Sequence, residues 1–315
     1  MQTPLHQLIK NQMFEGFLLV KTGEQRTSSN GSKFLDMTLS DLSGEVNAKM
    51  WDGNTPAPAA GSVVKVRAMM MEYNGRPQLR VDKLRLAEEK DQVDMSQLVP
   101  CAPYPPEEML ALINDRIARM EDEELRAVVT RRLEQAGDAL MYFPAAQKLH
   151  HAEKGGLLHH TSTMLRLAEA ICDIYPSLDA DLLAAGVILH DLCKMSEMRA
   201  DATGVVTDYT AEGLLLGHLV QGVSEIQRVC DEVGARPELK LMLSHMILSH
   251  HDLPEYGSPK PPMFPEAEIL HEIDLMDARM YEMNYALSGV RPGTFTERIW
   301  SLDRRLYRRR RPEDK

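Results

Sequence analysis

The spacing of apolar residues changes character at about residue 90. Before that point, short runs alternate apolar and polar positions, and turn-forming clusters at 28–31, 41–44, 52–56 and 74–77 separate them. The alternation predicts five strands, at 16–21, 34–39, 46–51, 63–68 and 78–84. Five short strands with such turns between them favour a small closed barrel.

The order of these strands resembles an OB-fold, with residues 57–61 at the position where a helix sometimes lies. Residues 91–106 contain four prolines and predict a linker. From about residue 107 the period becomes helical, and the expected helices cover 107–120, 122–137, 157–175, 180–195, 209–233, 237–251 and 265–288. We therefore expect a multidomain chain, with a small all-β OB-fold barrel over 1–90, an all-α domain over 107–300 and a basic tail over 301–315.

The net charge of −11 is unevenly distributed: +2 over 1–90, −17 over 91–300 and +4 over 301–315. The acidic middle region argues against strong nonspecific binding to duplex nucleic acid. The chain has no run of about eighteen apolar residues, and its first residues lack the pattern of a secretion signal. The four cysteines show no CxxC spacing. We expect a cytoplasmic protein without membrane association.

Ten of the eleven histidines fall between His150 and His271. In this region seven side chains are of the types that ligate divalent metals: His160, His190, Asp191, His218, His250, His251 and Asp274. Both Asp191 and Asp274 lie in or beside nearly uniform apolar runs, where burying a carboxylate without a partner is costly. A bound cation would compensate the charge of both carboxylates. Taken alone, His160 would be interpreted as a packed or surface histidine.

Four of these residues resemble the H…HD…D signature of HD-superfamily metallohydrolases: His160, His190, Asp191 and Asp274. The resemblance spans roughly residues 140–290. It implies an all-helical HD domain and divalent-metal phosphohydrolase chemistry, with His190 and Asp191 as catalytic residues. Related families often have the sequence HD-x-G-K. In this chain Lys194 occupies the lysine position of that motif and Cys193 the glycine position. Lys194 is expected to act catalytically on a substrate phosphate, and the alternative is a solvated lysine at a helix end.

The three other histidines resemble those that ligate a second metal in HD-domain phosphodiesterases: His218, His250 and His251. The alternative is that they bind substrate phosphate directly. The implied cofactor is a pair of divalent ions. Manganese is favoured, and iron, cobalt, nickel or magnesium are alternatives.

Segments 209–213, 217–218, 247–251 and 255–271, together with the OB-like N-terminal region, resemble the YhaM-type 3′→5′ exoribonucleases. This likeness extends over nearly the whole chain and implies a metal-dependent exonuclease acting on single-stranded RNA, with DNA as a further candidate. The residues expected to bind the strand are Lys33, Lys49, Trp51, Arg67, Tyr73, Arg76 and Arg80. The alternative is that these charges are solvated strand faces and the aromatics fill the barrel, as we expect for Phe34.

Two other functions remain open at this point. One is a nucleotide or cyclic-dinucleotide phosphohydrolase of the HD type, in which the barrel would have no clear function. The other is a non-catalytic single-strand-binding protein, in which the metal ligands would have no function. The sequence does not determine the oligomeric state, and a homo-oligomer is one possibility. It also leaves open whether the arginine-rich tail contacts nucleic acid or is disordered.

Overall fold

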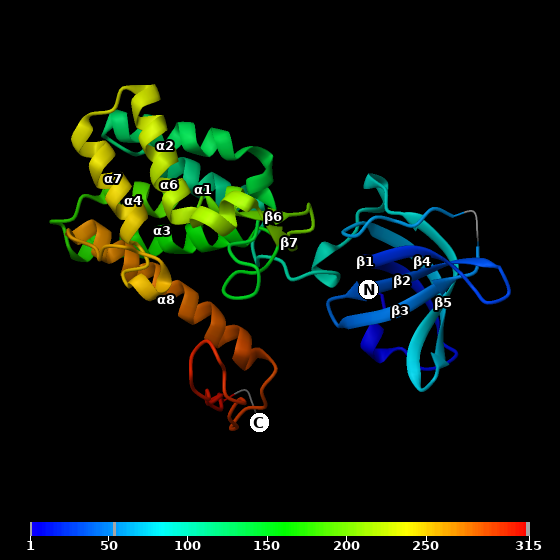
Figure 1. Cartoon of the computed structure of the whole chain (residues 1–315). Helices are drawn as coiled ribbons and strands as arrows, with labels where there is room; N and C mark the ends of the chain where they lie inside the picture. The colour runs from blue at the N-terminus through cyan, green and yellow to red at the C-terminus, as the bar shows by residue number, and fades with distance from the viewer. Residues whose placement is uncertain (1, 53–54, 313–315) are drawn as a thin grey trace. The chain divides into compact units, whose positions relative to one another are not determined.

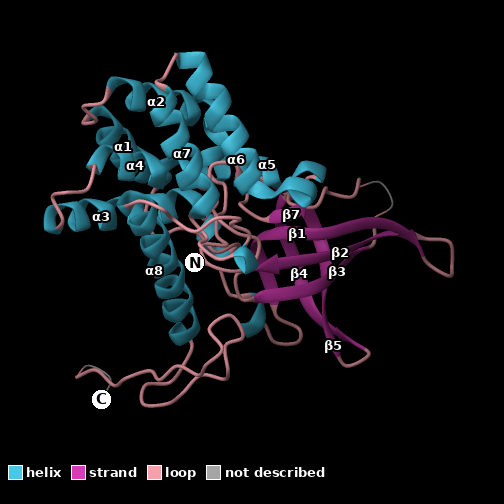
Figure 2. Cartoon of the chain, turned by 60° about the vertical axis from the view of Figure 1, so that its left-hand side comes forward, coloured by secondary structure: helices cyan, strands magenta, loops and turns pink. Residues whose placement is uncertain are grey.

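The computed structural model describes residues 2–52 and 55–312, and the chain divides into two compact units. The first contains Met1–Cys101 with Asp201–Val205, and the second contains Ala102–Ala200 with Val206–Lys315. Figure 2 shows that strands dominate the first unit and helices the second. Parts of two predicted segments, the turn at 53–54 and the end of the tail at 313–315, lie outside the described residues.

The first unit is a closed five-stranded barrel, as predicted. Its strands are β1 (Met13–Thr27), β2 (Lys33–Asp41), β3 (Gly44–Met50), β4 (Val63–Tyr73) and β5 (Arg76–Leu86). They close in the order β1-β2-β3-β5-β4, and the β3–β5 pair is parallel while the others are antiparallel. Short 3₁₀ helices flank the barrel at Leu5–Gln7, Glu89–Asp91 and Met95–Gln97.

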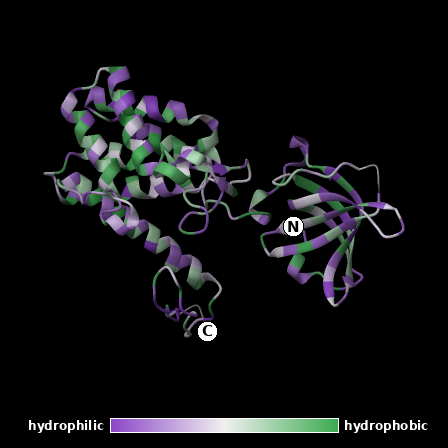
Figure 3. Cartoon of the chain, in the orientation of Figure 1, coloured by the Kyte–Doolittle hydropathy of each residue, from purple (hydrophilic) through white to green (hydrophobic). Residues whose placement is uncertain are grey.

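Alternation along the strands builds the barrel interior. On β2, Leu35, Met37 and Leu39 are fully buried, and the residues between them face outward. Figure 3 shows the alternation as bands of green and purple along the strands. Each fully buried side chain of this size contributes roughly 1.5–3 kcal/mol relative to an exposed one. The barrel therefore has its own hydrophobic core.

The second unit is a helical bundle, as predicted. Its helices are α1 (Pro106–Ala118), α2 (Glu123–Ala136), α3 (Gly156–Ile174), α4 (Ala180–Leu189), α5 (Lys194–Glu197), α6 (Ala211–Val233), α7 (Pro237–Ser249) and α8 (Pro265–Ser288). Every residue of α4 from Leu182 to Leu189 is buried, and α2, α3, α7 and α8 pack around it. Figure 1 shows α8 extending beyond the other helices toward the C-terminus. Further 3₁₀ turns lie at Gly137–Met141 and Pro254–Tyr256.

Two local features differ from the predictions. The helix expected over 180–195 ends at Leu189, and the chain turns before α5 begins at Lys194. A hairpin of β6 (Met198–Ala200) and β7 (Val206–Tyr209) interrupts the helices, since strands of three and four residues are too short to show a period. Within the described residues, none of the helices combines the length and the apolar character needed to cross a membrane.

Candidate metal centre

All seven predicted ligands come together inside the helical unit. They belong to α3 (His160), the end of α4 and the turn after it (His190, Asp191), α6 (His218), the end of α7 (His250, His251) and α8 (Asp274). Three overlapping groups place their ligand atoms within 4.8 Å of one another: His160–His190–Asp191, His190–His250–Asp274 and His218–His250–His251. Residues separated by more than a hundred positions thus line one site.

The last helical turns of α4 and α7 orient their histidines in the same way. His190 Nδ1 lies 2.8 Å from the carbonyl oxygen of Val187, and His250 Nδ1 lies 2.8 Å from that of Ile247. A ring nitrogen that donates to a carbonyl is protonated, so the other nitrogen carries the free lone pair. Each Nε2 therefore points into the centre, where its lone pair can ligate a metal.

Asp191 lies between two groups of histidines. Its Oδ2 is 3.3 Å from His190 Nε2 and 3.8 Å from His160 Nε2. Its Oδ1 is 3.5 Å from His218 Nε2 and 3.8 Å from His250 Nε2. Each carboxylate oxygen thus faces a different pair of rings.

A break in α6 directs His218 into this centre. Gly217 has φ 69° and ψ 165° inside the helix, a conformation open mainly to glycine. The next residue, His218, is held by a 3.0 Å contact between its Nδ1 and Glu197 Oε2. On α7, His251 Nδ1 lies 2.9 Å from the carbonyl oxygen of Tyr256. Glu197 was not predictable from the sequence, because no local pattern relates it to a histidine twenty-one positions away.

Several buried atoms of the centre lack a hydrogen-bond partner among the described residues: Asp191 Oδ1, His218 Nε2 and His250 Nε2. A buried polar atom without a partner costs about 1–3 kcal/mol. These three atoms are all lone-pair donors of the kinds that divalent metals accept, and they face one another. The residues present therefore fit a divalent metal, and the centre is compatible with metal binding.

The charges of the centre support the same conclusion. Burial by itself lowers the pKa of His160, but hydrogen bonds to Asp274 and Asp277 raise it to about 9. Burial holds the pKa of His250 well below its ordinary value. The pKa of Asp274 is lowered despite burial, mainly by its hydrogen bond to His160, with a 3.2 Å separation between Oδ1 and Nε2. A cation would displace the proton from His160 and keep the carboxylates charged.

Lys194 is buried in the centre rather than solvated at a helix end. Its Nζ lies 2.6 Å from Asp191 Oδ2. Burial by itself lowers the pKa of Lys194, but the adjacent Asp191 raises it above its ordinary value. The side chain therefore brings a fixed positive charge next to the carboxylate that both groups of histidines face.

A second set of polar residues borders the centre, and we call it the outer cluster: His151, Glu153, His159, Asp277 and Tyr281. Asp277 Oδ2 lies 2.7 Å from His160 Nδ1 and 2.7 Å from His151 Nε2. Glu153 lies 2.7 Å from His159 Nδ1 and accepts a 3.0 Å hydrogen bond from Tyr281. Among the described residues, no buried side-chain atom of the outer cluster lacks a partner. The sequence patterns give no sign that His151, Glu153, His159 and Tyr281 pair with one another.

On the barrel, some of the predicted strand-binding residues form one aromatic and basic group. Trp51 stacks on Phe34 with ring centroids 4.8 Å apart. Lys49 Nζ lies 5.3 Å from the Phe34 centroid and 5.5 Å from that of Tyr73. Phe34 was expected to fill the barrel, but it lies outside the barrel's core cluster and is covered by Trp51. We call Phe34, Lys49, Trp51 and Tyr73 the barrel aromatic group.

The remaining predicted strand-binding residues are exposed on the strands. Arg80 lies opposite Lys49 in the parallel β3–β5 pair, and Arg76 lies opposite Tyr73. Both arginines therefore border the barrel aromatic group. Arg67 lies opposite Glu15 and Lys83, farther along β4, while Lys33 is the first residue of β2.

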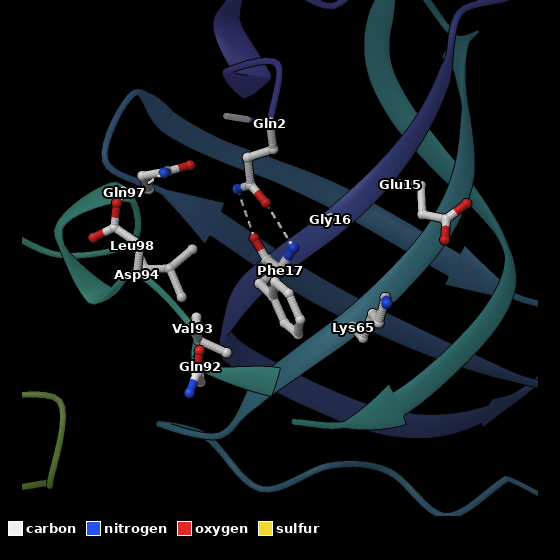
Figure 4. A pocket seen from close by; sticks show the side chains of 10 residues that line it. All are labelled: Gln2, Glu15, Gly16, Phe17, Lys65, Gln92, Val93, Asp94, Gln97 and Leu98. Atoms are coloured by element: carbon white, nitrogen blue, oxygen red, sulfur yellow. Dashed lines mark hydrogen bonds between the residues drawn. The ribbon is translucent and has the colours of Figure 1, made fainter. Parts of the chain in front are cut away.

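A cavity of about 520 Å³ elsewhere in the barrel unit has a different character. Gln2 pairs there with both backbone groups of Phe17, at 2.8 Å and 2.7 Å (Figure 4). Its lining includes Glu15, Lys65 and Asp94 but no histidine or cysteine. It therefore has no metal-ligand set comparable to that of the helical unit.

Comparison with known proteins agrees with the helical site. Residues 157–279 match the HD domain family, and residues 102–185 match a family described as a putative helicase. The HD match includes all seven proposed ligands, from His160 to Asp274. Together with the histidine and aspartate groups, it indicates a metal-dependent phosphohydrolase.

The barrel is similar to solved OB-fold domains at low identity. Two structures of a replication protein A domain from Methanococcus maripaludis, one titled as its second OB-fold domain, are 16% and 18% identical, with TM-scores of 0.24 and 0.25. Each comparison covers 28% of this chain and 97% of the other. A replication protein A heterotrimer bound to single-stranded DNA is 12% identical over 25% of this chain and 61% of the other, with a TM-score of 0.21. The strand order of the barrel and the HD match together describe a two-domain protein, a five-stranded OB-like barrel followed by a helical HD region.

Proposed function

We propose that this protein is a metal-dependent 3′→5′ exonuclease that hydrolyses phosphodiester bonds of single-stranded RNA. The observation that carries the proposal is the position of Asp191, whose two oxygens face separate groups of histidines. On the Oδ1 side, His218 Nε2 and His250 Nε2 are buried without a hydrogen-bond partner among the described residues. A carboxylate between two ligand groups suits a pair of divalent ions. Such pairs act on the attacking and leaving oxygens of phosphodiesters.

In this proposal His160, His190, Asp191 and Asp274 would hold one ion, and His218, His250 and His251, together with Asp191, would hold the other. Bound divalent ions would activate water and stabilise the negative charge that develops on the phosphoryl oxygens. The protein's own contribution is orientation. The carbonyl oxygens of Val187 and Ile247 orient the rings of His190 and His250. Asp277 orients the ring of His160.

Lys194 is proposed to act in catalysis through its charge. Its ammonium group already contacts Asp191, so it borders the position where a phosphate held by the ions would lie. A lysine there offers an additional point charge to the phosphate. In the absence of substrate, the same charge offsets part of the negative charge of the buried carboxylates.

The barrel aromatic group is proposed to bind the strand. Exposed rings beside cations bind single strands without strong sequence preference, since every base has a face on which to stack. Trp51 and Tyr73 are more than half exposed, and Lys49, Arg76 and Arg80 supply positive charge around them. These features favour a nuclease over a hydrolase of free nucleotides, which has no need of such a surface.

The test uses metal-stripped protein and a 5′-labelled single-stranded RNA, with and without added Mn²⁺. The expected result is a Mn²⁺-dependent ladder that shortens from the 3′ end and is absent with the Asp191→Ala variant. Intact RNA together with hydrolysis of nucleotides or cyclic dinucleotides would replace the proposal by the small-substrate alternative. Strand binding without hydrolysis of either substrate class would leave a binding protein.

A further inference from the structure

The segment after α8 folds into a hairpin, which we call the C-terminal hairpin (residues 291–311). Its two arms are joined by backbone hydrogen bonds from Thr296 to Leu306 at 2.8 Å, from Ile299 to Arg304 at 2.9 Å and from Arg308 to Thr294 at 3.0 Å. The described part of the arginine-rich tail therefore has a defined backbone conformation.

The hairpin combines positive charge with exposed aromatic rings. It contains eight arginines against two acidic residues, Glu297 and Asp303. Trp300 is 87% exposed, and Phe295 and Tyr307, whose centroids lie 5.0 Å apart, are at least half exposed. Arg305 lies over the Phe295 ring at 5.5 Å. Guanidinium groups bind phosphates through paired hydrogen bonds and also stack on rings.

One arginine fixes the hairpin to the end of α8. Arg308 donates to the carbonyl oxygen of Val290 at 2.6 Å and also contacts those of Ser288 and Leu287 at 3.3 Å and 3.4 Å. A cation at the final carbonyls of a helix is favourable because these groups carry partial negative charge. The orientation of the hairpin is therefore tied to the helix that also supplies Asp274.

One face of α8 connects the metal centre to this hairpin. Its residues recur at helical spacing: Asp274, Asp277, Tyr281, Tyr285 and Ser288. The rings of Tyr281 and Tyr285 are nearly parallel, with centroids 6.5 Å apart, and Tyr285 is 71% exposed. At 1.5 Å per residue, the face runs about 21 Å from Asp274 to Ser288. The orange helix and red hairpin in Figure 1 follow this path.

We propose that the C-terminal hairpin binds the single strand upstream of the end that is hydrolysed. This inference rests on the proposed function, because it assumes that the strand's end lies at the metal centre. At about 3.4 Å per stacked nucleotide, 21 Å corresponds to about six nucleotides. A single strand can stack its bases on the three exposed rings while its phosphates bind the neighbouring arginines. An acidic protein surface would pair with the arginines but leave the rings exposed.

The test measures strand binding to full-length protein in chelator, where no hydrolysis occurs. The probes are fluorescent oligouridylates of twelve and four nucleotides, and the variants are Trp300→Ala and Arg309→Gln. The matched control is Tyr175→Ala, since Tyr175 is 58% exposed and lies about as far from His160 along α3 as Ser288 lies from Asp274 along α8. Unchanged melting temperatures will establish that each variant is folded.

For the twelve-nucleotide strand we expect Trp300→Ala to weaken binding about tenfold. We expect Arg309→Gln to lower the slope of log affinity against log salt by about 0.7, the value for one lost phosphate contact on a single strand. The four-nucleotide strand and the Tyr175→Ala control should show no change. Equal affinities for the hairpin variants and wild type would overturn the proposal. The proposal would also be overturned if the wild-type chain self-associated in a salt-dependent way and Arg309→Gln lost this self-association while keeping strand binding. That result would mean that the hairpin binds a second copy of the chain.

A parallel assay separates this proposal from the proposed function. Mn²⁺-dependent hydrolysis of the four-nucleotide strand should be equal in wild type, Trp300→Ala and Arg309→Gln. If wild type hydrolyses it and the binding assay shows no effect, only the hairpin proposal fails. If wild type hydrolyses no strand of either length, the exonuclease proposal fails, and a hairpin that still binds the longer strand does so in a non-catalytic protein.

Discussion

The metal centre and the outer cluster are adjacent, and both are built from buried histidines and carboxylates. They differ in how their polar atoms are satisfied. In the outer cluster, Glu153 pairs with His159 and Tyr281, and Asp277 pairs with His151. In the centre, three buried atoms on Asp191, His218 and His250 have no partner among the described residues. Residue types alone do not separate a metal site from an ion-pair network, whereas unpaired buried lone pairs do.

The sharpest test of this contrast is Asp191→Ala, which removes the carboxylate that both groups of histidines face. We expect hydrolysis of labelled RNA to fall by about 1,000-fold, the upper end of the range for the loss of one electrostatic catalytic group. Metal content, measured by mass spectrometry after gel filtration, should fall as well. Full activity of this variant in Mn²⁺ would mean that the proposed centre is wrong.

Metal addition should stabilise the folded protein through the centre alone. At a free Mn²⁺ concentration of about 100 times Kd, binding contributes about 2.7 kcal/mol to the free energy of unfolding. Thermal unfolding of metal-stripped protein should therefore shift upward with Mn²⁺ in wild type and in Glu153→Gln. In Asp191→Ala the shift should be largely lost. A shift lost in Glu153→Gln and kept in Asp191→Ala would reverse the assignment of the two sites.

Asp277 connects the two regions, and its replacement should give an intermediate effect. Asp277→Asn keeps the side chain's shape but weakens the contact that orients His160 Nδ1. Removing such a partner costs roughly 10–100-fold in metal affinity or activity. We expect the Mn²⁺ concentration for half-maximal hydrolysis to rise within this range, with nearly normal activity at saturating metal. An unchanged Mn²⁺ dependence would show that Asp277 has no part in positioning the ligand.

Glu153→Gln should have the smallest effect on activity. Burial by itself raises the pKa of Glu153, but hydrogen bonds from His151, His159 and Tyr281 lower it to about 2. A carboxyl with a depressed pKa stabilises the fold above its ordinary pKa of 4.5, and this stabilisation is lost as pH falls toward 2. We expect Glu153→Gln to cost about 1–3 kcal/mol in urea unfolding at pH 7 and less below pH 4.5. Loss of one metal equivalent in this variant would make the outer cluster a metal site.

Much of the fold was predictable because the patterns that specify it are local. Alternation predicted the five strands, and helical periodicity predicted the main helices. The proposed ligands stood out because Asp191 and Asp274 interrupt apolar runs. The position of Phe34 was not predictable, since Phe34 and Leu35 are both apolar and alternation does not decide which one faces inward. Contacts such as Glu197 with His218 depend on the tertiary fold and leave no mark in sequence spacing.

The position of Asp191 also bears on how the centre fills with metal. If one ion occupied the side of Oδ2 alone, the buried Oδ1, His218 Nε2 and His250 Nε2 would remain uncompensated. The same atoms are equally uncompensated in the empty centre, so they favour binding of an ion on that side whether or not the other side is filled. Because both ions would share the Asp191 carboxylate and repel each other, the first ion would weaken binding of the second, and this coupling free energy would act equally in both directions. Under this linkage, singly loaded protein would be populated over a wide range of metal concentration.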